Sequence, residues 1–130
     1  MDPGKMFNVF GVAGSGMAAQ RVRMELIAQN LAHAQNTDRG DGKPWIRREA
    51  VFQSVVDGPD AGQVRVADTV EDKRTPPVRL KMPGHPNADA QGYVSFPNVN
   101  PIFEMTDLLS ASRAYEANLQ ASRVFRQMVE

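Results

Sequence analysis

Few residues in this chain are of the types that carry out chemistry. The sequence contains no cysteine, which excludes disulfides, thiolate metal sites and thiol catalysis. Its two histidines lie far apart: His33 falls near the end of an expected helix, and His85 lies between Gly84 and Pro86 in an expected turn. None of the serines has the surroundings of an activated nucleophile. We therefore expect no catalytic site, no metal site and no cofactor, in a protein that is not an enzyme.

Two glycine-containing segments have some features of ligand-binding loops. Residues 11–16 (GVAGSG) lack the preceding strand and the final Lys-Ser/Thr of a phosphate-binding loop. They predict either a stretch of small residues where helices approach closely or a helix that starts near Ser15. Residues 87–92 (NADAQG) lack the third oxygen ligand and the closing glutamate of a calcium loop. We expect a turn there, stabilised by Asn and Asp side chains.

Charge and hydropathy exclude two further classes of function. The 15 Lys and Arg residues balance the 15 Asp and Glu residues, so no basic excess is available for phosphates and we expect no nucleic-acid partner. No apolar run reaches the roughly 18 residues that a membrane span needs, so we expect no direct membrane insertion. The first residues lack the pattern of a secretory signal, so we expect any export to proceed without a cleaved signal peptide.

The positions of glycine and proline divide the chain into three parts. Residues 37–97 hold seven of the nine prolines and six of the ten glycines, which is typical of turns and short strands. We therefore expect an N-terminal helical arm over residues 1–36, a β-rich middle segment over 37–97 and a C-terminal helical arm over 98–130. The predicted fold class is α+β.

Apolar residues in both arms recur at the alternating spacing of three and four that is typical of paired helices. In the first arm this seam comprises Phe10, Ala13, Met17, Gln20, Met24, Ile27 and Leu31. In the second arm it comprises Met105, Leu108, Ser112, Tyr115, Leu119, Ser122, Phe125 and Val129. We expect the arms to form a coiled-coil-like pair, either parallel or antiparallel. The second arm is apolar over more than one seam, which indicates either lateral partners or a closed helical domain.

The middle segment carries strand signals. Residues 45–56 end in a run of β formers, residues 63–70 alternate valine with other residues, and the turn-forming residues 57–62 lie between them. This order predicts a hairpin with a loop. Residues 78–82 and 93–96 are further short strand candidates, although the neighbouring prolines limit their pairing.

Several longer motifs resemble those of a known family, the bacterial flagellar axial proteins of the rod and hook. GSGMAAQRVRM at residues 14–24 and AQNLAHAQNT at 28–37 are similar to the family's N-terminal signature, with Gly14 in place of the usual alanine and His33 in place of a frequent asparagine. GHPNADAQGYV at 84–94, PNVN at 97–100 and EMTDLLSASRAYEAN at 104–118 resemble the short proximal-rod members most specifically. The likeness covers roughly three quarters of the chain by these motifs.

The resemblance implies a structural subunit of the proximal rod, the drive shaft that crosses the periplasm, transmits torque and carries the export channel. Such subunits polymerise through their terminal helices, which are typically disordered before assembly. The implied location is the flagellar basal body. The implied partners are copies of itself, proximal and distal rod proteins, the rod–MS ring adaptor and the type III export apparatus. The alternative function is a soluble helical adaptor or an export chaperone, which would have ordered termini.

The resemblance also assigns residues to the assembly interface. Apolar and polar side chains at motif or seam positions in each arm are expected to make contacts between subunits or to fix the register of neighbouring helices. From the first arm these residues are Met17, Gln20, Arg21, Met24, Ile27, Asn30, Leu31 and Asn36. From the second arm they are Glu104, Met105, Asp107, Leu108, Leu109, Arg113, Tyr115, Asn118 and Leu119. The second helix is expected to have Asn98 or Asn100 as its cap and Pro101 at or near its first turn.

Overall fold

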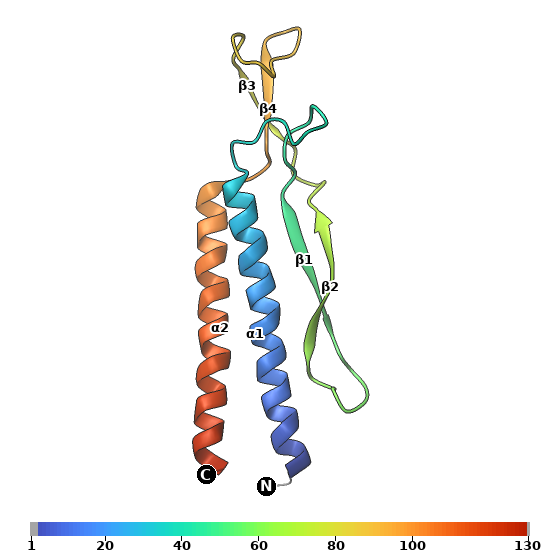
Figure 1. The fold of residues 1–130 in the computed structure, drawn as a ribbon, viewed down its shortest axis with the longest axis vertical. Coiled ribbons are helices and arrows are strands. Elements are labelled where there is room, and N and C mark those ends of the chain that lie inside the picture. Colours follow the sequence, from blue (N-terminus) through green and yellow to red (C-terminus); the bar gives the residue numbers. More distant parts are fainter. Residues whose placement is uncertain (1–2, 130) are drawn as a thin grey trace.

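The computed structural model describes residues 3–129 and consists of two long helices joined by two small hairpins. The elements in order are α1 (Pro3–Ala32), β1 (Arg48–Ser54), β2 (Val64–Glu71), β3 (Val78–Lys81), β4 (Tyr93–Phe96) and α2 (Pro101–Val129). This architecture confirms the predicted α+β class, with helices at the two ends and a hairpin-containing middle (Figure 1).

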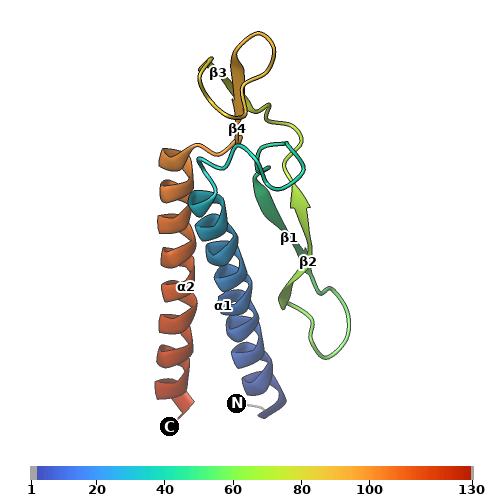
Figure 2. The same cartoon turned by 45° about the horizontal axis from the view of Figure 1, so that its top comes forward.

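The two helices run antiparallel, with both chain ends at the same end of the molecule (Figure 1). Helix α1 packs against α2 and also against β1 and β2, whereas α2 has no comparable contact with these strands within the described part of the chain. Figure 2 shows α1 between α2 and the hairpin from a second direction. The rings of Phe10 and Phe125 meet edge to face, 5.2 Å apart, near the chain ends. An ion pair between Arg23 and Asp107 joins the helices near their other end.

The glycines of residues 11–16 lie inside α1, which begins at Pro3, so the expected helix start near Ser15 is wrong. Proline is favoured in the first helical turn because its missing N–H would have no intrahelical partner there. The expected close approach is confirmed at Gly16, where an added Cβ would lie 2.9 Å from Oδ1 of Asn118 on α2. At Gly14 an added Cβ would meet nothing within 4 Å.

Helix α1 ends at Ala32, earlier than the uninterrupted helix expected to residue 36. The chain turns at residues 33–35, where the His33 ring stacks on the Trp45 ring with centroids 3.9 Å apart. The side-chain amide of Asn36 contacts Nδ1 of His33 at 3.0 Å. These contacts hold the chain in place after the helix ends and direct it toward β1.

Strands β1 and β2 form the predicted hairpin, from the Arg48–Glu71 pair to the Ser54–Val64 pair, with an irregularity between Val51 and Phe52. Its loop closes through hydrogen bonds from Gly62 N to Val55 O and from Val55 N to Gln63 O, each 2.8 Å long. Ser15 of α1 fixes the hairpin to the helix, since its Oγ donates to Val12 O and accepts from Val64 N.

Strands β3 and β4 are the two further strand candidates, and they pair with each other. The prolines at 76, 77 and 83 flank residues 78–81 and leave those four residues free to pair. The connection at 87–92 is a turn, as expected. The Oδ1 atom of Asp89 accepts hydrogen bonds from the backbone N–H groups of Gln91 and Tyr93, each 2.9 Å long.

Asn100 caps helix α2. Its Oδ1 accepts from Ile102 N at 3.0 Å, while its backbone carbonyl accepts from Glu104 N at 2.9 Å, and Pro101 is the first helical residue. Of the two expected caps, Asn100 is therefore confirmed. Asn98 instead binds the β-rich middle of the chain.

We expect Asn100→Ala to lower the free energy of unfolding by about 1 kcal/mol, because the first N–H groups of α2 lose their acceptor. Urea denaturation followed by circular dichroism measures this change. Asn100→Asp keeps the oxygen acceptor and serves as the control, with a stability close to that of the original chain. Equal losses in both variants would contradict the capping role.

Candidate functional site

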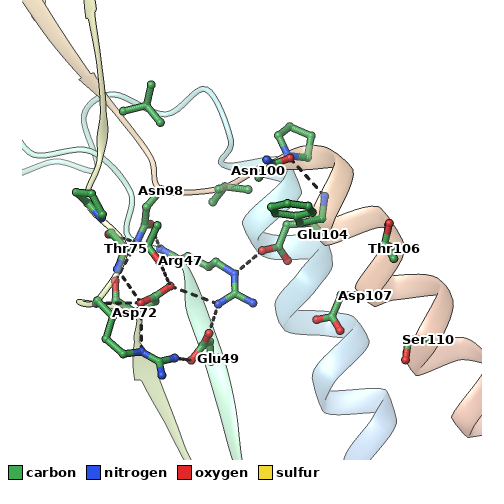
Figure 3. A pocket seen from close by; sticks show the side chains of 16 residues that line it. Arg47, Glu49, Asp72, Thr75, Asn98, Asn100, Glu104, Thr106, Asp107 and Ser110 are labelled. Carbon is green, nitrogen blue, oxygen red and sulfur yellow. Dashed lines mark hydrogen bonds and ion pairs between the residues drawn. The ribbon is translucent and has the colours of Figure 1, made fainter.

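A cluster of charged residues joins the middle segment of the chain to the start of α2. The guanidinium group of Arg47, just before β1, donates to Glu104 on α2 through Nε and to Glu49 on β1 through Nη1. Nη1 also lies 3.6 Å from Oδ2 of Asp72, just after β2. Figure 3 shows this guanidinium among the three carboxylates. We call Arg47, Glu49, Asp72 and Glu104 the Arg47 cluster.

Backbone groups hold the Arg47 cluster in place. The Oδ1 atom of Asn98 accepts from Arg47 N at 2.8 Å, and its Nδ2 donates to the carbonyls of Asp72 and Thr75 at 2.9 and 3.0 Å. Asp72 N donates to Arg47 O at 2.7 Å. Asn98 is buried, so one side chain satisfies three backbone groups that water does not reach easily. The β-rich middle is thereby fixed to the residues that lead into α2.

The pKa of Asp72 lies below its ordinary value of 3.8. Burial acts to raise it, but the hydroxyl of Thr75, the N–H groups of Arg74 and Thr75, and the charge of Arg47 outweigh burial. Burial acts to lower the pKa of Arg47, but hydrogen bonds and charges from Glu104 and Glu49 outweigh it, so the pKa of Arg47 is raised. Asp72 and Arg47 are therefore both held in their ionised forms near neutral pH.

Acidification is expected to weaken the cluster. Because the pKa of Asp72 is lower in the folded chain than in the unfolded chain, its stabilising contribution is complete above 3.8 and is lost as the pH falls below that value. We expect the free energy of unfolding, measured in urea, to fall as the pH drops below about 4. Asp72→Asn removes the titrating group and should give a shallower dependence; identical pH profiles would contradict this assignment.

One carboxylate oxygen of Glu104 has no partner among residues 3–129. The residue is only 2% exposed, and while Oε1 binds Arg47, the buried Oε2 accepts no hydrogen bond from residues 3–129. An unsatisfied buried acceptor of this kind costs about 1–3 kcal/mol or more. Such a group calls for a structural or functional explanation.

The cluster borders a groove between the segment after β2 and the first three turns of α2. Its α2 side is formed by Phe103, Glu104, Thr106, Asp107 and Ser110. Within residues 3–129 no three His, Cys, Asp or Glu side chains are placed to hold a metal ion. No helix in that part of the chain is both long and apolar enough to cross a membrane.

A second anchor lies at the end of α1. Asn30 is 1% exposed; its Oδ1 accepts from Arg48 N at 3.0 Å and from the indole Nε1 of Trp45 at 3.2 Å, and its Nδ2 donates to Arg48 O at 2.9 Å. These three hydrogen bonds fix the start of β1 to the helix. With the Arg47 cluster, they determine how the hairpin lies along α1.

The outer face of α2 remains uncovered in the single chain. Large apolar side chains exposed on this helix are Ile102, Phe103, Met105, Leu109, Val124 and Met128. The side facing α1 is narrow and contains Ala111, which is fully buried. A helix with so much apolar surface exposed is typical of a protein that associates with others.

Comparison with known proteins decides the family. Residues 90–130, which include all described residues of α2, match the family described as "Flagellar basal body rod FlgEFG protein C-terminal". The chain is 39% identical over 125 residues to the flagellar basal-body rod protein FlgC of Escherichia coli O6:H1, covering 95% of this chain and 92% of that protein. The FlgC protein of Aquifex aeolicus is 40% identical over 126 residues, covering 96% and 92%. The chain belongs to the FlgC family of flagellar basal-body rod proteins.

The FlgC match extends over both helices and the middle segment, and a third relative from Salmonella typhimurium has the same coverage at 39% identity. The resemblance found in the sequence motifs is therefore confirmed. The two long helices and the small hairpins make up the fold of this FlgC-family chain.

Several residues assigned to the assembly interface make contacts inside the single chain. Ile27 and Asn30 are buried against the rest of the chain, and Glu104 belongs to the Arg47 cluster. Gln20 and Asp107 both bind Arg23, Asn36 contacts His33, and Asn118 donates a hydrogen bond to the Ala114 carbonyl. Their roles between subunits stay predictions.

The remaining assigned residues retain more solvent contact. Met105, Leu109, Arg21 and Arg113 are exposed. The half-buried ones are Met17, Met24, Leu31, Leu108, Tyr115 and Leu119. The predicted seam placed Met105 toward the partner helix. This placement is wrong, because Met105 is 56% exposed and the neighbouring Glu104 is buried instead.

Sequence reasoning did not identify Arg47 and Asp72 as functional residues. Arg47 lies 57 positions from Glu104, and no local spacing connects them. The PNVN motif at 97–100 was a usable signal for Asn98, but it indicated a helix cap rather than a bridge to the middle segment.

Proposed function

We propose that this FlgC-family rod protein polymerises through the outer face of α2 together with the open face of α1, and that the Arg47 cluster holds the middle segment in a fixed position for assembly. The observation that carries the proposal is the uncovered apolar face of α2, which Leu109 (60% exposed) and Met105 represent. Burying apolar side chains is the main driving force of most protein association.

The neighbours in this proposal are other copies of the chain and the other rod subunits of the flagellar basal body, including the proximal and distal rod proteins and the rod–MS ring adaptor. The structural role in the rod follows from family membership. Export by the type III apparatus without a cleaved signal peptide is part of the proposal.

The alternative of a helical adaptor or export chaperone is less well supported. A closed helical domain would cover the apolar face of α2, whereas six large apolar side chains of this helix are exposed. Family membership also points to a component of the rod itself.

We expect Leu109→Asp to abolish rod assembly and swimming while leaving export of the chain intact, since a buried charge without a partner opposes association. Leu109 suits this test better than Leu108, which is half-buried in the single chain. The measurement is motility, together with the amount of the chain in isolated basal bodies, in the source bacterium lacking its own copy.

Val56→Asp is the matched control, because Val56 is also apolar and, at 79%, even more exposed than Leu109, but belongs to the hairpin loop and to neither helix. This variant should swim normally. Normal swimming of the Leu109→Asp strain would contradict the proposed use of the α2 face.

A further inference from the structure

The groove at the start of α2 is lined by more carboxylate groups than guanidinium groups. Four carboxylates line it, those of Glu49, Asp72, Glu104 and Asp107, and two guanidinium groups, those of Arg47 and Arg74, face them. Its volume is about 1120 Å³. We call this the acidic groove, and its composition favours an additional positive charge.

Two carboxylate oxygens of the acidic groove have no donor among residues 3–129. One is the buried Oε2 of Glu104. The other is Oδ2 of Asp107, since Asp107 uses Oδ1 for its ion pair with Arg23. Both residues lie on α2, three positions apart, and therefore on neighbouring turns of one face. The side chain of Asp107 is one-third exposed, so an incoming group can reach it from solvent.

The side chain of Arg21, on the opposite side of the helix pair, is a cation without a partner among the described residues. Arg21 is exposed and has no hydrogen bond or ion pair with any described residue, Glu25 one turn further on included. Arg23 marks the groove side of α1, because its guanidinium reaches Asp107. Two residues correspond to about 200° around a helix, so Arg21 points away from the groove of its own chain.

Arg21 and the groove also lie at the same height along the helices. The Arg23–Asp107 and Gly16–Asn118 contacts fix the antiparallel register, which places Arg21 opposite the turn that contains Ser110. Two copies placed side by side with their long axes parallel would bring Arg21 of one copy to the acidic groove of the next.

We propose that Arg21 of one copy enters the acidic groove of a neighbouring copy and pairs with Asp107, beside the buried Glu104. The proposal rests on the proposed function, in which copies of this chain are neighbours in the rod. The contact joins different surfaces of the two copies, so it is heterologous and can be repeated around a tube. A guanidinium group suits this role because it donates several hydrogen bonds in a fixed plane to carboxylates.

Cysteine cross-linking in assembled rods tests this contact. The chain has no cysteine, so Arg21→Cys combined with Ser110→Cys introduces the only two thiols. After mild oxidation of isolated basal bodies, we expect disulfide-linked dimers and larger multiples of the chain. Each single variant should give none, and neither should Arg21→Cys with Ala121→Cys, because position 121 lies about 16 Å further along α2.

Charge reversal provides a second measurement. Arg21→Glu should reduce the number of completed rods roughly tenfold or more, because it places like charges together. Adding Ser110→Lys should restore rods, and Ser110→Lys alone should reduce them. Restoration by the double variant, Arg21→Glu with Ser110→Lys, would not occur if Arg21 only affected folding.

The outcomes of the cross-linking experiment distinguish a failure of the Arg21 contact from a failure of the proposed function. If the doubly substituted chain (Arg21→Cys with Ser110→Cys) is present in basal bodies but forms no disulfide-linked multimers, or is cross-linked instead to a different rod protein, the Arg21 contact is overturned and the rod function stands. Absence of the original chain from basal bodies would overturn both.

Discussion

Replacing Arg47 with methionine is expected to lower the free energy of unfolding by about 3–5 kcal/mol, because it leaves carboxylates buried without their cation. Arg47 holds Glu104, Glu49 and Asp72 together, and two of these, Glu104 and Asp72, are buried. Methionine retains much of the volume of the arginine stem, so the change removes mainly charge and hydrogen bonds. Urea denaturation followed by circular dichroism at neutral pH gives the difference.

Arg74→Met is the matched control for Arg47→Met. Arg74 also contacts Glu49 and Asp72, but its side chain is 83% exposed, and exposed ion pairs contribute about 0–1 kcal/mol. We expect a small effect in this variant. A loss in Arg47→Met no larger than that in Arg74→Met would contradict the central position of Arg47 in the cluster.

Gly16→Leu is expected to force α1 and α2 apart. Even a Cβ at this position would lie 2.9 Å from the Asn118 side chain, and moving that side chain away would cost the hydrogen bond that its amide donates to the Ala114 carbonyl. Overpacking of this kind costs about 1–3 kcal/mol despite the better helix propensity of leucine. We expect the variant to unfold at a lower urea concentration and to fail to complete rods.

Gly14→Ala is the control for Gly16→Leu, since an added Cβ meets nothing within 4 Å at that position. The substitution should raise the free energy of unfolding by about 1 kcal/mol through helix propensity alone. If Gly14→Ala and Gly16→Leu changed stability in the same direction, the close approach of the helices at Gly16 would not be the cause.

Local patterns predicted the elements of this fold, because helices and hairpins are specified by nearby residues. The absence of glycine and proline from residues 17–36 and 102–130 predicted most of α1 and α2, and the turn at 57–62 between two runs of β formers predicted the hairpin. The helix faces were harder to predict. Met105 shares its heptad spacing with half-buried Leu108, yet it points to solvent, because α2 is apolar on more sides than one partner helix can cover.

The charged cluster could not be predicted from local spacing. Its members come from three separate segments, and the hydrogen bond between Arg47 and Glu104 spans 57 positions. Asp72, Glu49 and Glu104 are ordinary acidic residues in the sequence, and only their burial around one guanidinium distinguishes them. The family motifs did indicate Glu104 and Asn98, but not the partners that give these residues a structural role.

Cryo-electron microscopy of basal bodies isolated from the source bacterium tests the proposed assembly most directly. We expect each copy to contribute two antiparallel helices of about 44 Å to the rod, with Leu109 and Met105 of α2 buried against a neighbouring subunit. A rod in which this face of α2 remains exposed to solvent would contradict the proposed assembly.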